Sequence, residues 1–214
     1  MTGLADAFTH PDPSARLQAA LAAGMQADLA DLDVLLSRCA IEPDFQVREM
    51  LTWALIRLPA ADVVPRLVAE LARPEPQARS QALHTLSKFR DPSAWPAVAE
   101  RLDDTDQAVR RTAWYAAVAL VPSDQQHWLA QKLAARLGQG ERDLQLSLSR
   151  ALVALGPDLV APLLDQARHH PDEAVRAHAA ATQRLLEDPD SGFALDILRA
   201  RREVAEGRTR SAKG

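Results

Sequence analysis

The stretch Pro43-Asp44-Phe45-Gln46-Val47-Arg48 recurs along the chain as a turn residue, an acid, two spacers, a small aliphatic residue and Arg. The copies end at the following anchor residues: Arg16, Arg48, Arg79, Arg110, Gln145 (a degenerate copy) and Arg176. These anchors are 32, 31, 31, 35 and 31 residues apart. A fixed period of this length is typical of an array of stacked repeats, in which each repeat packs on its neighbours.

Each repeat has the pattern of two short helices. In residues 60–89, Val64, Leu67 and Leu71 recur at helical spacing, Pro74 ends that helix, and a second apolar stripe follows. The acid four residues before each anchor is well placed to cap the second helix. The sequence therefore predicts helix pairs joined by tight turns.

This pattern, with Ala three residues and Leu seven and ten residues after the anchor, resembles the HEAT-repeat family over residues 11–186. In particular it is similar to the bacterial variety named after phycobilisome lyases. The resemblance implies an all-α, right-handed superhelix of about six helix pairs, whose second helices line a concave groove. It also implies a hydrogen-bonded ladder between neighbouring repeats, formed by Asp44, Arg48, Glu75, Arg79, Asp106, Arg110, Asp172 and Arg176. Gln145 would remove one step of that ladder.

We expect one solenoid domain over residues 1–189, because every repeat contributes to one continuous core. Residues 190–206 carry an amphipathic pattern, from Phe193 to Leu198, that predicts a C-terminal capping helix. Residues 207–214 are basic and poor in apolar groups, which predicts a disordered tail.

Composition narrows the function classes. The net charge of −4 argues against a nucleic-acid binder, whose footprint is usually basic. The single Cys39 cannot form an internal disulfide, which fits a reducing cytoplasm. We see neither a signal peptide nor an 18-residue apolar run, so we expect a cytoplasmic protein with no membrane contact.

The candidate site lies among residues that depart from the repeat. On a helical wheel, the positions one, four, five and eight after each anchor face the groove. Leu83 is one of several apolar residues there, and Trp95 and Trp128 are instead predicted to be core residues of first helices. The candidate partner-binding residues are Trp53, His84, Arg111, Trp114, Tyr115 and Arg150.

No motif for a cofactor, a metal or a catalytic nucleophile stands out. His169, His170 and His178 are close in sequence, but their spacing alone is a weak signal for a metal site. We therefore expect no metal, no cofactor and no catalytic residue.

The sequence favours a non-enzymatic scaffold that binds a partner peptide or helix in the groove through aromatic anchors. Three alternatives stay open. A HEAT-like alkylpurine DNA glycosylase or other DNA-binding protein would use Glu49 beside Trp53. A phycobilin lyase is suggested only by the name of the repeat variety. A structural subunit would form a homodimer through the apolar strip.

Overall fold

The computed structural model describes residues 3–188, which form two compact units divided after Gln125. We call the described residues up to 125 unit 1 and those from 126 onwards unit 2. Every regular element of the described residues is a helix, which confirms the predicted all-α fold. The predicted capping helix (190–206) and basic tail (207–214) lie outside the described residues. The prediction of one domain over residues 1–189 stays a prediction.

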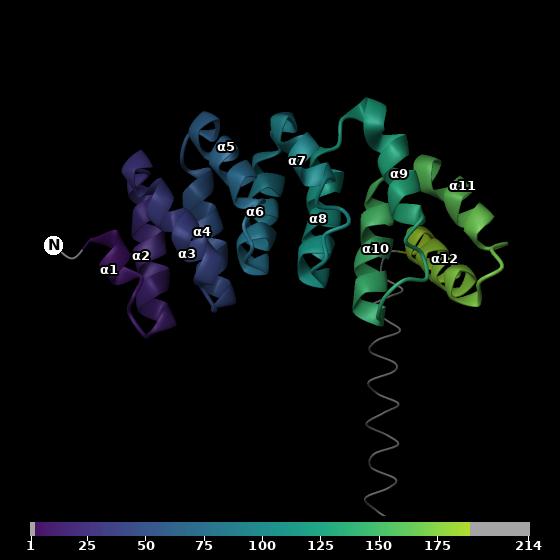
Figure 1. Cartoon of the computed structure of the whole chain (residues 1–214), viewed down its shortest axis with the longest axis horizontal. Coiled ribbons are helices and arrows are strands. Elements are labelled where there is room, and N and C mark those ends of the chain that lie inside the picture. Colours follow the sequence, from purple (N-terminus) through teal and green to yellow (C-terminus); the bar gives the residue numbers. More distant parts are fainter. Residues whose placement is uncertain (1–2, 189–214) are drawn as a thin grey trace, which may run out of the picture. The chain divides into compact units, whose positions relative to one another are not determined.

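Unit 1 is a succession of helix pairs (Figure 1). The first helices are α3 (Leu32–Ile41), α5 (Ala60–Glu70) and α7 (Trp95–Ala99), and the four-residue α1 (Leu4–Ala7) precedes the first repeat. The second helices are α2 (Pro13–Gln26), α4 (Phe45–Ile56), α6 (Pro76–Phe89) and α8 (Gln107–Leu120). Short 3-10 turns lie at Leu29–Asp31, Pro92–Ala94 and Ser123–Gln125.

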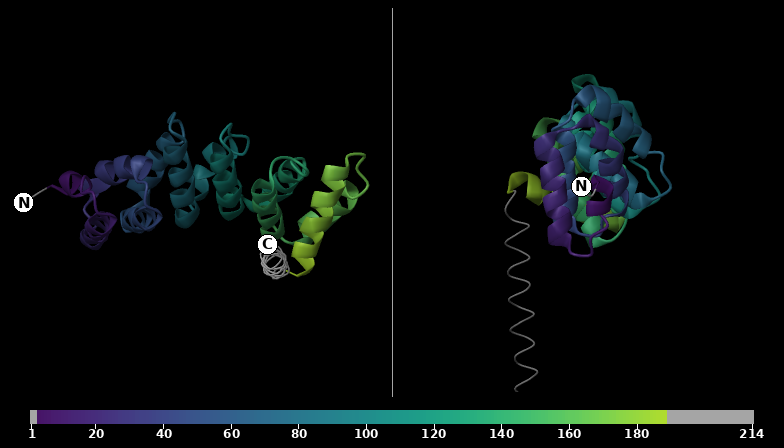
Figure 2. Two further views of the ribbon diagram at one scale, coloured as in Figure 1. Left: turned by 90° about the horizontal axis from the view of Figure 1, so that it is seen from below. Right: turned by 90° about the vertical axis from the view of Figure 1, so that its left-hand side faces the viewer.

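Unit 2 contains two helix pairs among its described residues. The first pair is α9 (Gln126–Ala134) with α10 (Arg142–Ala154), and the second is α11 (Pro157–Ala167) with α12 (Glu173–Glu187). Each first helix packs on the second helix of its own repeat, and α10 also packs on α12. Further views of the chain are given in Figure 2.

The recurring acid caps four of the six described second helices, as the pattern predicts, whereas Glu75 and Glu141 stand at the same position without a side-chain cap hydrogen bond. The carboxylate of Asp44 accepts a hydrogen bond from the Val47 N–H at 3.0 Å. Asp12, Asp106 and Asp172 cap α2, α8 and α12 in the same way. These contacts satisfy backbone donors that the first helical turn leaves unpaired.

The predicted core stripe is confirmed. Leu51 and Leu55 of α4, Leu86 of α6 and Leu152 of α10 are fully buried at positions three or seven after the anchor. In unit 1 the second helices α2, α4, α6 and α8 pack on one another in chain order (Figure 1). The inner helices α4 and α6 therefore each have two flanks covered by neighbouring second helices besides their core stripe, and only a narrow stripe of each can meet solvent.

Candidate interaction surface

The accessible stripe of the second helices in unit 1 comprises positions one, five and nine after the anchor. We call these twelve residues the second-helix face. Each of them is exposed or half-buried, and none is buried. The twelve residues are Leu17, Leu21 and Met25 on α2; Glu49 and Trp53 on α4 with Arg57 directly after it; Ser80, His84 and Lys88 on α6; and Arg111, Tyr115 and Ala119 on α8.

Position four, which the helical wheel places on the groove side, does not belong to this accessible stripe. Ala20, Thr52, Leu83 and Trp114 occupy this position on the four helices, and all are buried. Where one second helix stacks on the next, as α4 on α6, position four faces that helix: the Oγ1 atoms of Thr52 and Thr85 lie 3.4 Å apart. The prediction that Trp114 and Leu83 face the groove is therefore wrong.

Trp114 has a structural role instead. Its side chain is only 3% exposed, and its Nε1–H donates to the Leu102 carbonyl at 3.1 Å. A buried indole N–H needs such a partner. Trp114 thus joins α8 to the turn that follows the first helix of its own repeat.

Trp53 is held against α2 by a glycine. A Cβ atom built on Gly24 would lie 2.3 Å from Cζ3 of Trp53, so only glycine leaves room for this ring. The ring is half-buried, and the guanidinium of Arg57 lies 6.0 Å from its centroid. Part of Trp53 therefore serves the packing of α2 on α4, and the remainder is accessible on the face.

His84 and Glu49 connect α4 to α6 on the same face. The Nε2 atom of His84 lies 3.1 Å from Oε1 of Glu49. Burial lowers the pKa of His84 and Lys88 adds to this effect, while the Glu49 carboxylate acts in the opposite direction. The net lowering favours the neutral imidazole of His84 in this pair.

Tyr115 is the most exposed aromatic residue of the face, with 56% of its surface accessible. The Lys88 ammonium from the neighbouring helix lies 5.7 Å from the Tyr115 ring centroid. A cation at this distance is attracted to the ring. The exposed ring and its cation thus form one polar-aromatic element across α6 and α8.

The remaining tryptophans divide between core and surface. Trp95 is buried, as predicted, and its Nε1–H donates to Oε1 of Gln125 at 2.7 Å. Trp128 on α9 is 46% exposed, so its prediction as a core residue is wrong. Both occupy the start of a first helix, and only the packing distinguishes them.

Arg150 is exposed on α10 of unit 2, and it is described apart from the face of unit 1.

On the same helix, the degenerate anchor Gln145 makes one of the contacts that an anchor Arg makes. Its Nε2–H donates to the Gly140 carbonyl at 3.0 Å, five residues back. Arg48 donates to the Pro43 carbonyl at the same offset.

The predicted ladder has a different geometry. The anchor Arg48 donates from Nη1 to the carbonyls of Glu42 and Pro43, in its own turn, and Arg79 and Arg176 do the same. Arg110 differs, because its Nε is buried without a hydrogen bond among the described residues. Asp44, Asp106 and Asp172 cap helices, and Glu75 pairs with Arg73. Among residues 3–188, none of these four acids forms an ion pair with an anchor.

The ion pairs between neighbouring repeats use other acids. Arg16 donates from Nε and Nη2 to both carboxylate oxygens of Glu42, at 2.9 and 2.8 Å. Arg79 contacts Asp104 in the same bidentate way, at 2.9 Å for each bond. Glu42 and Asp104 each lie six residues before the next anchor. The sequence pattern missed them because only two repeats carry an acid at that position.

Two equivalent polar clusters join second helices through the position-four residue. In unit 1, Gln81 donates to the Oγ1 of Thr52 and, at 3.4 Å, to the Arg48 carbonyl. In unit 2, Nε2 of His178 lies 3.0 Å from both Ser149 Oγ and the carbonyl of the anchor Gln145. The Nδ1 atom of His178 also accepts the Gly138 N–H at 3.0 Å. The imidazole must therefore be neutral, consistent with the lowering of its pKa by burial.

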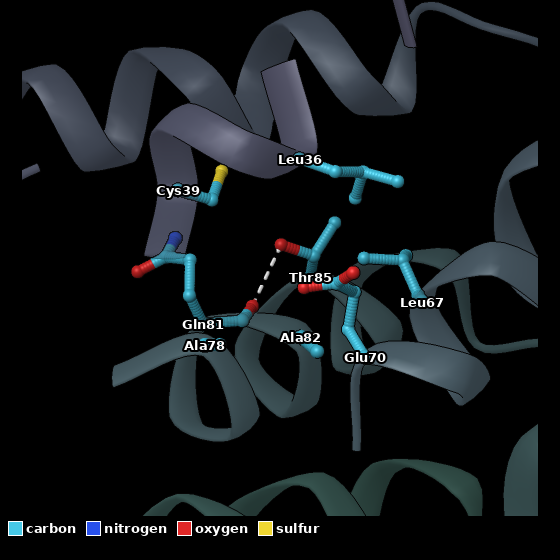
Figure 3. A pocket seen from close by; sticks show the side chains of 8 residues that line it. All are labelled: Leu36, Cys39, Leu67, Glu70, Ala78, Gln81, Ala82 and Thr85. Atoms are coloured by element: carbon cyan, nitrogen blue, oxygen red, sulfur yellow. Dashed lines mark hydrogen bonds between the residues drawn. The ribbon is translucent and has the colours of Figure 1, made fainter. Parts of the chain in front are cut away.

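A small cavity lies between α3, α5 and α6 in unit 1 (Figure 3). Its volume of about 10 Å³ has room for a single water molecule. The carboxylate of Glu70, the hydroxyl of Thr85 and the Cys39 side chain line it, and burial raises the pKa of Cys39 to about 12. A protonated thiol in so small a space is not a ligand site.

The three C-terminal histidines do not converge on a metal. His169 Nδ1 lies 2.9 Å from the Asp165 carbonyl, His170 accepts the Asp172 N–H, and His178 belongs to the buried cluster above. Within residues 3–188, no group of three or more His, Cys, Asp or Glu side chains could hold a metal ion. None of the described helices has the length and apolar character needed to cross a membrane.

Comparison with known proteins supports the repeat assignment. Residues 64–131 match the family model for HEAT repeats. No curated protein sequence matches the chain. The narrower likeness to the variety named after phycobilisome lyases stays a prediction.

Solved structures of engineered and designed proteins are similar to the chain at low sequence identity. Two crystal structures titled as engineered proteins are 18% and 19% identical, with TM-scores of 0.45 and 0.47. Each covers 88% of this chain, which in turn covers 97% and 96% of them. A designed armadillo repeat protein is 16% identical with a TM-score of 0.47, over 86% of this chain and 98% of its own.

Proposed function

We propose that this chain of HEAT repeats is a protein-interaction module that binds a partner segment on the second-helix face of unit 1. Stacked helical repeats commonly present such an extended surface to other proteins. The observation that carries the proposal is the exposure of Met25 (73%) and Tyr115 (56%) at the two ends of a face with no buried member. Accessible aromatic and apolar groups beside cations are typical of interface hot spots.

The geometry gives less support to the DNA-glycosylase alternative. The only acid on the face, Glu49, is engaged by His84, and Trp114 is buried rather than available to a base. Three face cations, Arg57, Lys88 and Arg111, would release few counterions from a DNA backbone. A protein partner therefore fits this mixture of groups better than DNA. The lone Cys39, a buried free thiol, is compatible with action in the reducing cytoplasm.

The proposal is tested by selecting binders from a random peptide library on the full chain and measuring their affinities by calorimetry. Tyr115→Ala should weaken the selected peptides by about thirtyfold, the effect of losing a hot-spot aromatic side chain. Phe45→Ala is the matched control, because Phe45 is a 63% exposed aromatic residue at the start of α4 and outside the face. The proposal fails if both variants retain the wild-type affinity or lose it equally.

A further inference from the structure

The second-helix face changes in polarity from α2 to α8. On α2 it presents Leu17, Leu21 and Met25 and no charge. From α4 to α8 it presents three cations and the single acid Glu49, so its net charge is +2 with His84 neutral. The whole chain has a net charge of −4. One end of the face is thus apolar, and the other is a cationic area on an acidic protein.

Two of the three cations of this area lie beside aromatic rings. Arg57 lies 6.0 Å from the Trp53 ring, and Lys88 lies 5.7 Å from the Tyr115 ring, while both side chains remain exposed. The Glu49 charge, in contrast, lies beside the His84 ring. An incoming carboxylate would therefore meet two exposed cations whose side chains already rest on the rings, which lowers the entropy lost on binding.

The dimensions of the face suit a helix. Positions one to nine span eight residues of each second helix, which is about 12 Å at 1.5 Å per residue. This width matches the diameter of about 10–12 Å of an α-helix with its side chains. Four helices packed about 8–10 Å apart give a length of roughly 24–30 Å, equal to about 16–20 helical residues.

We infer that the partner is an amphipathic, acidic helix of another protein that lies across α2, α4, α6 and α8. Its apolar side chains contact Leu17, Leu21 and Met25, and its carboxylates meet Arg57 and Lys88. This inference rests on the proposed function and adds the chemistry and direction of the partner. Attraction between the acidic end and the cationic area also orients the helix and accelerates its encounter.

The inference is tested with three fluorescein-labelled, 18-residue helical peptides and fluorescence anisotropy on the full chain. All three peptides have the same apolar stripe. Their polar positions in one half carry Glu, Gln or Lys. The Glu peptide should bind best, the Gln peptide about tenfold more weakly, and the Lys peptide not measurably. The affinity of the Glu peptide should also fall as the NaCl concentration is raised, because the paired charges are exposed and salt screens them.

Charge reversal identifies the contact. Lys88→Glu should lower the affinity for the Glu peptide by about tenfold and raise the affinity for the Lys peptide. Arg90→Glu, two residues further along at the exposed end of α6, is the matched control and should leave both affinities within about twofold. Tyr115→Ala should weaken the Glu peptide as it weakens library peptides.

The outcomes separate the two proposals. Equal binding of the Glu, Gln and Lys peptides, all weakened by Tyr115→Ala, overturns the inference and leaves the proposed function standing. Failure of the Glu peptide to bind overturns the inference, while the library selection still decides the proposed function. Tighter, Tyr115-dependent binding of a labelled oligouridine overturns both, because it makes nucleic acid the better partner.

Discussion

Glu42→Gln should destabilise unit 1 far more than any change to an exposed ion pair. The Glu42 side chain is fully buried between the first and second repeats. It accepts two hydrogen bonds from Arg16, one from Arg38 Nε at 2.7 Å and one from the Asp44 N–H at 2.9 Å. The substitution removes the negative charge and leaves two guanidinium groups facing a neutral amide.

The magnitude follows from the pKa of Glu42. Burial alone would raise this pKa, but the hydrogen bonds from Arg16, Asp44 and Arg38 outweigh burial and lower it from 4.5 to about 2. A tenfold change in proton affinity corresponds to about 1.4 kcal/mol, so the charged form stabilises the fold by about 3 kcal/mol over the protonated form. The loss of one partner from a buried ion pair has a similar cost, about 3–5 kcal/mol.

The pH dependence has a definite sign. Because the folded pKa of Glu42 lies below its usual value, its contribution is fully present above pH 4.5 and is lost as the pH falls towards 2. The stability difference between wild type and Glu42→Gln should therefore be about 3 kcal/mol at pH 7 and shrink steadily below pH 4.5.

Urea unfolding measures the effect through tryptophan fluorescence in a Trp128→Phe background. The remaining Trp53, Trp95 and Trp114 all lie in unit 1, so the signal reports that unit. Glu75→Gln is the control, since Glu75 is an exposed acid paired with Arg73, and it should cost less than about 1 kcal/mol. A loss below 1 kcal/mol for Glu42→Gln at pH 7, or an equal loss at pH 7 and pH 2.5, would refute the reasoning.

Three further changes test the packing between repeats. Asp104→Asn breaks the buried pair with Arg79 and should cost about 3 kcal/mol in urea unfolding. Gly24→Ala places a Cβ against Trp53 and should lower the melting temperature measured by circular dichroism, because a clash of about 1–3 kcal/mol exceeds the gain in helix propensity. The stability of unit 2, followed by the Trp128 signal taken as the difference between wild-type and Trp128→Phe fluorescence, should fall as the pH drops below 6.5, because the folded pKa of His178 is lowered. His178→Gln should remove that fall.

Each of these three has a result that contradicts it. Asp106→Asn is the control for Asp104→Asn, since Asn caps a helix as well as Asp does, and equal losses would deny the buried pair its role. A higher melting temperature for Gly24→Ala would show that the Trp53 ring moves at no cost. An unchanged pH profile in His178→Gln would mean that His178 is not the titrating group.

Much of the fold could be predicted from the recurring six-residue motif, because the structural features that depend on it are local. Helix capping by Asp44 and the apolar spacing of Leu51 and Leu55 each depend on residues within a few turns. The turn contacts of Arg48 follow the same rule, since they reach only five and six residues back.

The candidate site could be predicted only in part. A helical wheel places Trp53, His84 and Tyr115 on the accessible side, and all three lie on the second-helix face. It also places Trp114 there, one residue from Tyr115, although Trp114 is buried. A helical wheel predicts the direction in which a side chain leaves its own helix, but it does not predict where the neighbouring helix packs.

The sequence by itself determined the all-α repeats, the helix boundaries and the core stripe, since the 31-residue spacing and local hydrogen bonds suffice for them. Only the tertiary structure decided which positions stay accessible, because that depends on the close stacking of parallel second helices. It also decided that Glu42 and Asp104, rather than the recurring acids, pair with the anchors of the preceding repeat. Those contacts join residues 26 and 25 positions apart, where no local pattern reaches.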